Sequence, residues 1–207
     1  MLNEEIFYTD GYRLGLETIA KGATPESVFI GMHELYDSID RLIDALLKRA
    51  LQTDVKTDCS KGCAWCCHQP VFANDIEIGY LIDFLRESFS QVRVAEIFEK
   101  AAAKNTVVSA LPDKEMLNYK SACPLLRDNA CMAYAARPMA CRIYLSMNIA
   151  SCKRFFEKPS DKSNYPALLE FPLMAGRMLN QGFIAALSQN GKQVNEYRLE
   201  EGLELLS

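Results

Sequence analysis

The fold class is decided by residues 24–52, "TPESVFIGMHELYDSIDRLIDALLKRALQ". Thr24 is a candidate N-cap, and Pro25 suits the first position of a helix because an N–H group there has no partner within the helix. Apolar side chains then recur every three or four residues, at Phe29, Met32, Tyr36, Ile39, Ile43 and Leu46. That spacing puts them on one face of an α-helix. The stretch therefore predicts one long amphipathic helix.

Most of the remaining sequence favours helices, and alternating strand patterns are scarce. Further helices are predicted over 74–89 with Asn74 as the cap, over 91–105, from about 165 to 181 with an interruption at Pro172, over 183–188, and from about 195. We find no repeat, low-complexity tract or linker. The sequence predicts a mainly α fold: a single helical domain over residues 1–207, with cysteine-bearing loops at about 59–152 wrapped around a metal centre and flanked by terminal helices.

Composition limits the classes of function. The chain has 27 acidic and 23 basic residues among 207, so it has no overall attraction for nucleic acid or anionic membranes. Residues 1–20 lack the basic start and continuous apolar stretch of a signal peptide, and no apolar run approaches the roughly 20 residues that span a bilayer. We therefore expect a cytoplasmic protein, in which thiols stay reduced. A chain of this length buries a core without a metal, so a bound metal need not be mainly structural.

Eight cysteines form the strongest chemical signal. Four fall within nine residues, "CSKGCAWCC" at 59–67, and the full pattern is C-x3-C-x2-C-C, 55 residues, then C-x7-C-x9-C-x10-C. Thiolates are the ligands that zinc and iron–sulfur clusters prefer. We expect the two groups to converge on one centre. The candidate ligands are Cys59, Cys63, Cys66, Cys67, Cys123, Cys131 and Cys141, with the outlying Cys152 as an eighth candidate that is as readily a buried core residue.

Zinc and an iron–sulfur cluster both remain open as the cofactor. Structural zinc sites usually combine two short C-x2-C knuckles, and only Cys63 and Cys66 have that spacing. The longer later intervals lean slightly towards an iron–sulfur cluster. However, the cysteine spacing matches neither the bacterial nor the plant-type ferredoxin pattern.

The adjacent Cys66 and Cys67 point in different directions, so one of them is expected to be spare. Eight thiols allow two four-coordinate sites by number alone, and one centre with leftover thiols is the preferred interpretation. His68 follows the pair and is expected to support a ligand rather than to be one. His33 is expected to be a surface or packing residue. With only these two histidines, the chain offers no catalytic triad.

Basic residues are concentrated around the second cysteine group. Residues 119–162 contain eight Lys or Arg and only three acidic residues. Guanidinium groups such as those of Arg137 and Arg142 are expected to offset the charge of bound thiolates, unless this is simply a solvated basic surface. Pro138 is expected to fix the turn before Cys141.

These motifs together resemble a known family. "CSKGCAWCC", followed by "CPLL", "CMAYAARPMAC" and Arg142, is similar to the cysteine-cluster family named for its CxxCxxCC signature and described as zinc- or iron-chelating. The resemblance covers about residues 59–144, with Leu125 where an aromatic residue is common and Ala133 where isoleucine is usual. It implies binding of a metal ion or cluster by the seven cysteines from Cys59 to Cys141, and it implies no particular reaction.

The sequence thus favours a metal-binding protein with a redox or metal-handling role, and two other functions remain open. The same family includes a flagellin N-methylase, and the spacing of Cys59, Cys63 and Cys66 is also that of radical SAM enzymes. However, the repeated strand–helix units of those enzymes are missing. The other alternative is a zinc-stabilised module whose exposed helices bind an unidentified protein partner.

Overall fold

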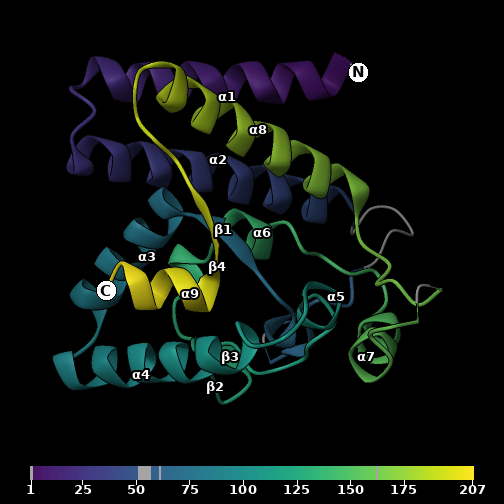
Figure 1. Ribbon diagram of the computed structural model, residues 1–207. Helices are drawn as coiled ribbons and strands as arrows, with labels where there is room; N and C mark the ends of the chain where they lie inside the picture. The colour runs from purple at the N-terminus through teal and green to yellow at the C-terminus, as the bar shows by residue number, and fades with distance from the viewer. Residues whose placement is uncertain (1, 51–56, 61, 162) are drawn as a thin grey trace.

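The computed structural model describes residues 2–50, 57–60, 62–161 and 163–207, and the chain runs mainly through helices (Figure 1). The predicted mainly α class is confirmed. The helices are α1 Leu2–Ala20, α2 Pro25–Ala50, α3 Asp75–Ser88, α4 Gln91–Val108, α5 Asp113–Met116, α6 Met139–Arg142, α7 Ile149–Glu157, α8 Glu170–Gln189 and α9 Leu199–Leu205. The 3-10 turns are η1 Trp65–His68 and η2 Tyr134–Ala136, and the strands are β1 Phe72–Asn74, β2 Leu126–Arg127, β3 Ala130–Cys131 and β4 Glu196–Arg198.

Helix α2 is the long helix predicted from residues 24–52, although residues 51 and 52 lie outside the described residues. The N–H of Ser27 donates to Thr24 Oγ1 at 3.2 Å, so Thr24 is the N-cap as expected. One face of the helix is buried, through Val28, Met32, Leu35, Tyr36, Ile39 and Ile43. His33 is exposed on the opposite side. The buried face packs with side chains of α6 and α8 in one apolar cluster.

Helices α1 and α8 lie along one another beside α2 (Figure 1). Their backbones approach so closely that a Cβ atom on Gly182 would lie 2.0 Å from the carbonyl oxygen of Tyr8. The helices predicted over about 165–181 and 183–188 are one helix, because α8 is continuous from Glu170 to Gln189. The predicted interruption at Pro172 is also wrong. Pro172 falls in the first turn, where an N–H group would have no partner within the helix.

The other half of the molecule contains α3, α4 and α9, which share a second apolar cluster. The predicted cap of α3 is confirmed: Asn74 Oδ1 accepts from the N–H of Glu77, and Glu77 Oε2 accepts from the N–H of Asn74. The helix predicted from about residue 195 begins later, at Leu199. Residues 196–198 form β4 instead, because they pair antiparallel with β1.

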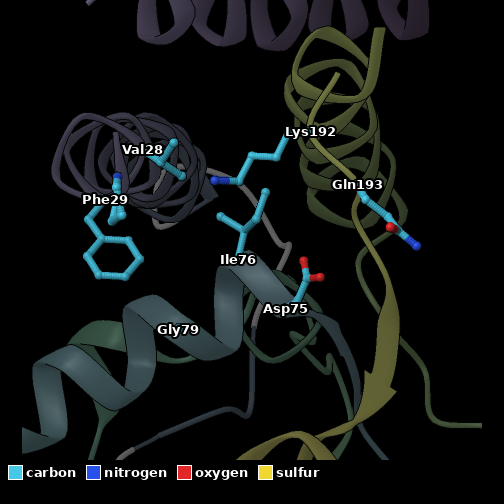
Figure 2. A pocket seen from close by; sticks show the side chains of 8 residues that line it. Val28, Phe29, Asp75, Ile76, Gly79, Lys192 and Gln193 are labelled. Carbon is cyan, nitrogen blue, oxygen red and sulfur yellow. The ribbon is translucent and has the colours of Figure 1, made fainter. Parts of the chain in front are cut away.

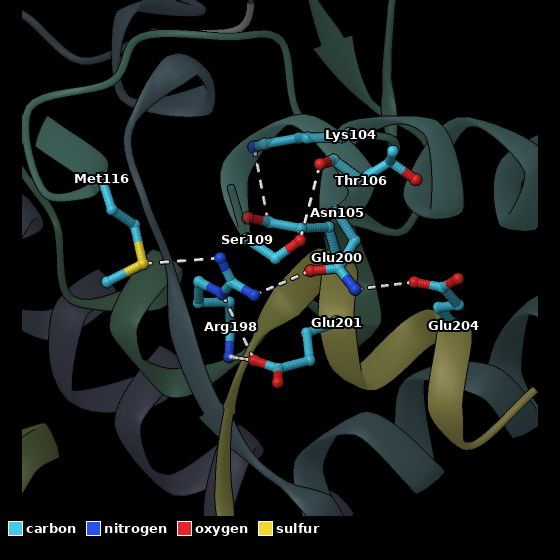
Figure 3. Close-up of polar contacts among 9 residues, drawn as sticks. All are labelled: Lys104, Asn105, Thr106, Ser109, Met116, Arg198, Glu200, Glu201 and Glu204. Atoms are coloured by element: carbon cyan, nitrogen blue, oxygen red, sulfur yellow. Dashed lines mark hydrogen bonds and ion pairs between the residues drawn. The ribbon is translucent and has the colours of Figure 1, made fainter. Parts of the chain in front are cut away.

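The end of β4 and the start of α9 are attached to α4 by polar contacts (Figure 3). Lys104 Nζ lies 3.4 Å from Glu200 Oε2, and Arg198 Nη2 donates to Asn105 Oδ1 at 2.8 Å. These contacts hold the C-terminal part of the chain against the helix that precedes the second cysteine group.

A pocket opens between the beginnings of α2 and α3 (Figure 2). It is lined by Pro25, Val28, Phe29, Asp75, Ile76, Gly79, Lys192 and Gln193, and none of these residues is a cysteine. None of the helices in the described part of the chain combines the length and the apolar composition that a membrane span needs.

Candidate metal centre

The two cysteine segments lie side by side although 55 residues separate them in the sequence. The N–H of Cys123 donates to the carbonyl oxygen of Cys67 at 2.8 Å, and the N–H of Ser121 donates to that of His68 at 3.1 Å. All eight cysteines are free of disulfides. The expectation that the two segments meet is therefore confirmed, whereas their sharing of an ion stays a prediction.

Short local turns shape the first segment. The N–H of Cys63 donates to Ser60 O at 3.0 Å, and Gly62 between them has a φ of +95°, which side-chain-bearing residues rarely adopt. The next turn is η1, in which the N–H of Cys67 donates to Ala64 O at 3.0 Å. The chain therefore bends at Gly62 and again in η1, between Cys59 and Cys67.

Cys59 receives a hydrogen bond to its sulfur. The N–H of Ser146 donates to Cys59 Sγ at 3.1 Å, which supports a negative charge on that sulfur. Burial raises the pKa of the Cys59 thiol, the Ser146 hydrogen bond opposes that rise, and the nearby thiols of Cys63, Cys66 and Cys152 add to it. Burial likewise raises the pKa of Cys63, with contributions from Cys66 and Cys152.

The second segment begins with a hairpin. Strands β2 and β3 place Leu126 opposite Cys131, and the residues at the turn, Asp128 and Asn129, have φ values of +50° and +58°. Asp and Asn tolerate this left-handed conformation better than most residues. The N–H of Leu126 donates to Cys123 O at 2.9 Å, so Cys123 lies at the start of the same hairpin.

Cys141 lies on the short helix α6. Its N–H donates to Pro138 O at 2.9 Å, so Pro138 begins the turn that carries Cys141, as predicted. Burial raises the pKa of Cys141, and the thiols of Cys123 and Cys131 add to that rise. Burial raises the pKa of Cys123 to about 11. A bound cation would have to overcome this cost of ionising the buried thiols.

The adjacent pair lies between the two segments. A hydrogen bond with Cys67, followed by burial, raises the pKa of Cys66 well above that of a free thiol. Cys66 in turn contributes to the raised pKa values of Cys59 and Cys141, one from each segment. Its thiol is therefore near both groups.

Arg137 and Arg142 in the second segment have different surroundings. Arg137 stacks on the ring of Tyr134 at 3.7 Å, and its charge lowers the pKa of Cys66 and Cys131 against the stronger effects that raise them. Arg142 is buried, lies 4.0 Å from the ring centre of Tyr36 and forms an ion pair with Asp40. The contacts of Arg142 fix the segment to α2. That Arg137 and Arg142 offset the charge of bound thiolates stays a prediction.

His68 is held by contacts of its own. Its Nδ1 lies 3.0 Å from Ala64 O, and its ring lies 5.2 Å from that of Phe156 on α7. These contacts orient the ring beside the adjacent pair of cysteines. The role predicted for it, support of a ligand, stays a prediction.

Three supporting residues were missed from the sequence. The carboxylate of Glu77 accepts hydrogen bonds from Tyr36 Oη and from the N–H of Met139, and it is buried. Asp40 pairs with Arg142, and Tyr144 Oη exchanges hydrogen bonds with Gln69. Only Glu77 had a usable signal, since it is an acid flanked by Ile76 and Ile78 at the start of an amphipathic helix.

No three His, Cys, Asp or Glu side chains among the described residues converge, as they lie, closely enough to hold one metal ion. The ligand set from Cys59 to Cys141 is therefore a prediction.

A family model decides the classification. The CxxCxxCC model, described as a "putative zinc- or iron-chelating domain", matches residues 58–167, just over half of the chain. The chain belongs to this family. The CxxCxxCC match contains all eight cysteines and extends past the resemblance at 59–144 to include α7 and Cys152. No curated protein and no solved structure matches the chain.

Proposed function

We propose that this CxxCxxCC protein holds a zinc ion or an iron–sulfur cluster between its two cysteine segments and serves a redox or metal-handling role. The observation that carries the proposal is the hydrogen bond from the Cys123 N–H to Cys67 O, 2.8 Å long, which brings the two segments together. The family description, zinc- or iron-chelating, is consistent with it.

The chemistry of the donors fits such a group. Seven of the cysteines are half-buried and Cys152 is buried, and none is consumed by a disulfide. Soft thiolate ligands favour zinc and iron–sulfur clusters over magnesium or calcium. The N–H of Ser146 already donates to Cys59 Sγ, which is the kind of outer contact that orients and stabilises a metal-bound thiolate. Cys59, Cys63, Cys66, Cys67, Cys123, Cys131 and Cys141 are the proposed ligands, with Cys152 as a further candidate.

Of the two groups, we favour the iron–sulfur cluster because the long intervals after Cys123 do not form a second zinc knuckle. When bound, a cluster supplies electron transfer, whereas zinc supplies rigidity to the loops. The radical SAM-like alternative gains no support, because both sheets in the described residues are two-stranded and antiparallel and no strand–helix repeat is found there.

Purification under anaerobic conditions, followed by metal analysis and a visible spectrum, tests the proposal. We expect iron and acid-labile sulfide in a coloured protein whose absorbance bleaches with dithionite. A colourless protein that contains zinc would instead favour the zinc-stabilised interaction module. A protein that contains neither metal, even after reconstitution with iron and sulfide or with zinc, would contradict the proposed function.

Substitutions then test the ligands. We expect Cys63→Ser and Cys141→Ser to lower the bound metal and the solubility of the protein. Val107→Ser is a suitable control, because Val107 is 48% exposed on α4 and the change also introduces a hydroxyl group. Full metal content in both cysteine variants would show that these two residues are not ligands.

A further inference from the structure

We infer that the eight cysteines form two metal sites, not one centre with leftover thiols. This inference rests on the proposed metal binding and concerns how the ligands are divided. The first site consists of Cys59, Cys63, Cys152 and one sulfur of the adjacent pair Cys66–Cys67. The second consists of Cys123, Cys131, Cys141 and the other sulfur of that pair.

Helix α7 brings Cys152 to the first segment. Cys152 and Phe156 are four residues apart in this helix and therefore share a face. The ring of Phe156 lies 5.3 Å from that of Trp65 and 5.2 Å from that of His68, so this face packs against η1. Cys152 is only 4% exposed. Its thiol therefore lies in the interior between α7 and the turn that carries the adjacent pair.

The chain before α7 is bonded directly to the start of the first segment. The N–H of Asp58 donates to Ser146 O at 3.0 Å, and the N–H of Ile149 donates to Asp58 Oδ2 at 3.1 Å. Between these two bonds, the N–H of Ser146 donates to Cys59 Sγ. Cys59 and the beginning of α7 thus form one hydrogen-bonded unit.

The second group is built on other elements. Cys123 and Cys131 belong to the β2–β3 hairpin, and both pack against the apolar cluster of α3, α4 and α9. Cys141 follows on α6, and the next residue, Arg142, donates from Nη2 to the carbonyl oxygen of Ala135 in η2, which follows the hairpin. The second group is therefore held by different elements of the fold from those that hold Cys59 and Cys152.

The adjacent pair Cys66–Cys67 lies between the two groups. Cys66 lies in η1, the turn that packs against α7 through Trp65 and His68. The backbone of Cys67 is bonded to Cys123. Neighbouring residues direct their side chains differently, so the pair is suited to give one sulfur to each group. Each group then reaches four thiolates, the number found in closed zinc sites and in four-cysteine clusters.

Titration of Co²⁺ into the reduced, metal-free full-length protein tests the division, with the absorbance of four-coordinate thiolate-bound cobalt as the readout. We expect the wild type to bind two equivalents. Cys152→Ser and Cys141→Ser should each bind one, and the double variant none. Cys59→Ser is a second variant for the first site, and circular dichroism checks that each variant is folded.

The outcomes separate the two proposals. One equivalent in the wild type overturns the two-site division and leaves the proposed function standing. Two equivalents that remain unchanged in both Cys152→Ser and Cys59→Ser also overturn the division. If Cys141→Ser removes all cobalt while Cys152→Ser removes none, a single centre is correct. No thiolate-bound cobalt in the wild type contradicts metal binding itself.

Discussion

The buried guanidinium group of Arg142 pairs with the carboxylate of Asp40, which lies 102 residues earlier in the chain on α2. Arg142 directly follows Cys141, so the pair connects the second cysteine segment to the long helix. Arg137 Nη2 lies 3.8 Å from the same carboxylate. One acidic side chain therefore pairs with both Arg137 and Arg142, which lie on either side of Cys141 in the sequence.

Asp40→Asn is expected to destabilise the protein by about 2 kcal/mol, because it leaves a buried guanidinium without its counter-charge. The cost stays below that of a fully buried pair since the Asp40 side chain is 41% exposed. Urea denaturation measures the change. Asp37→Asn is the matched control on the same helix: its partner Arg41 is 71% exposed, and the expected cost is under about 0.5 kcal/mol. Equal losses of unfolding free energy in the two variants would mean that the Arg142–Asp40 pair stabilises the protein no more than an exposed ion pair does.

Glu77 gives the stability a pH dependence. Burial raises the pKa of its carboxyl group, and hydrogen bonds from Met139, Asn74 and Tyr36 only partly oppose this. The folded protein thus holds the proton more strongly than the unfolded chain. The stabilisation from this group is complete below the ordinary glutamate pKa of about 4.3 and is lost as the pH rises through the raised pKa.

Glu77→Gln replaces the carboxyl group with an amide that does not titrate. It therefore removes this contribution to the pH dependence of the stability. We expect the unfolding free energy of the wild type, relative to Glu77→Gln, to fall as the pH increases above about 4.3. Urea denaturation at a series of pH values checks the trend, and Glu99→Gln, an exposed change on α4, gives the baseline for loss of one carboxyl group. If the difference in unfolding free energy between the wild type and Glu77→Gln stayed constant over the whole pH series, Glu77 would not be a source of the pH dependence.

Local signals explain what the sequence could predict. The starts of α2 and α3 depend on caps, Thr24 and Asn74, whose partners lie three residues away. Such patterns are readable in one stretch of sequence. The start of α9 is different, because residues 196–198 pair with β1, more than 120 residues earlier. Pro172 misled the prediction of α8, since a proline ends a helix in its interior but is tolerated in its first turn.

The candidate centre shows the same limit. The density of cysteines in residues 59–67 indicated the chemistry, and the meeting of the two segments followed from it. The side chains that support the segments could not be predicted in this way, because Asp40 and Glu77 contact residues that are 102 and 62 positions away in the sequence. Cys152 was the hardest cysteine to place from the sequence. Its position depends on the contact of Phe156 with Trp65, which no spacing in the chain reveals.

The buried pair of Lys104 and Glu200 is predicted to be a major support of the C-terminal helix (Figure 3). Their side chains are only 12% and 2% exposed. Glu200→Ala leaves an uncompensated charge in the interior, and we expect a loss of about 3 kcal/mol in unfolding free energy by urea denaturation. Glu157→Ala breaks the exposed pair with Lys153 and should cost under about 0.5 kcal/mol. A loss of that small size at Glu200 would show that the pair is in effect solvated.

Two glycines in helix interiors are expected to respond to alanine in opposite directions. A Cβ atom on Gly182 would lie 2.0 Å from Tyr8 O and 2.7 Å from Tyr12 N, so Gly182→Ala forces α1 and α8 apart. We expect a loss of about 3 kcal/mol. A Cβ atom on Gly79 would meet only the ring of Phe29, at 3.5 Å, beside the pocket of Figure 2. Gly79→Ala should therefore stabilise α3 by about 0.5 to 1 kcal/mol, because alanine loses less backbone entropy in a helix.

Thermal and urea unfolding followed by circular dichroism measure both changes. The expected result is a lower melting temperature for Gly182→Ala and a slightly higher one for Gly79→Ala. The comparison is informative because both substitutions add one methyl group to a helix, so only the surroundings of the new atom differ. If Gly182→Ala were as stable as the wild type, the close approach of α1 to α8 at Tyr8 would be wrong.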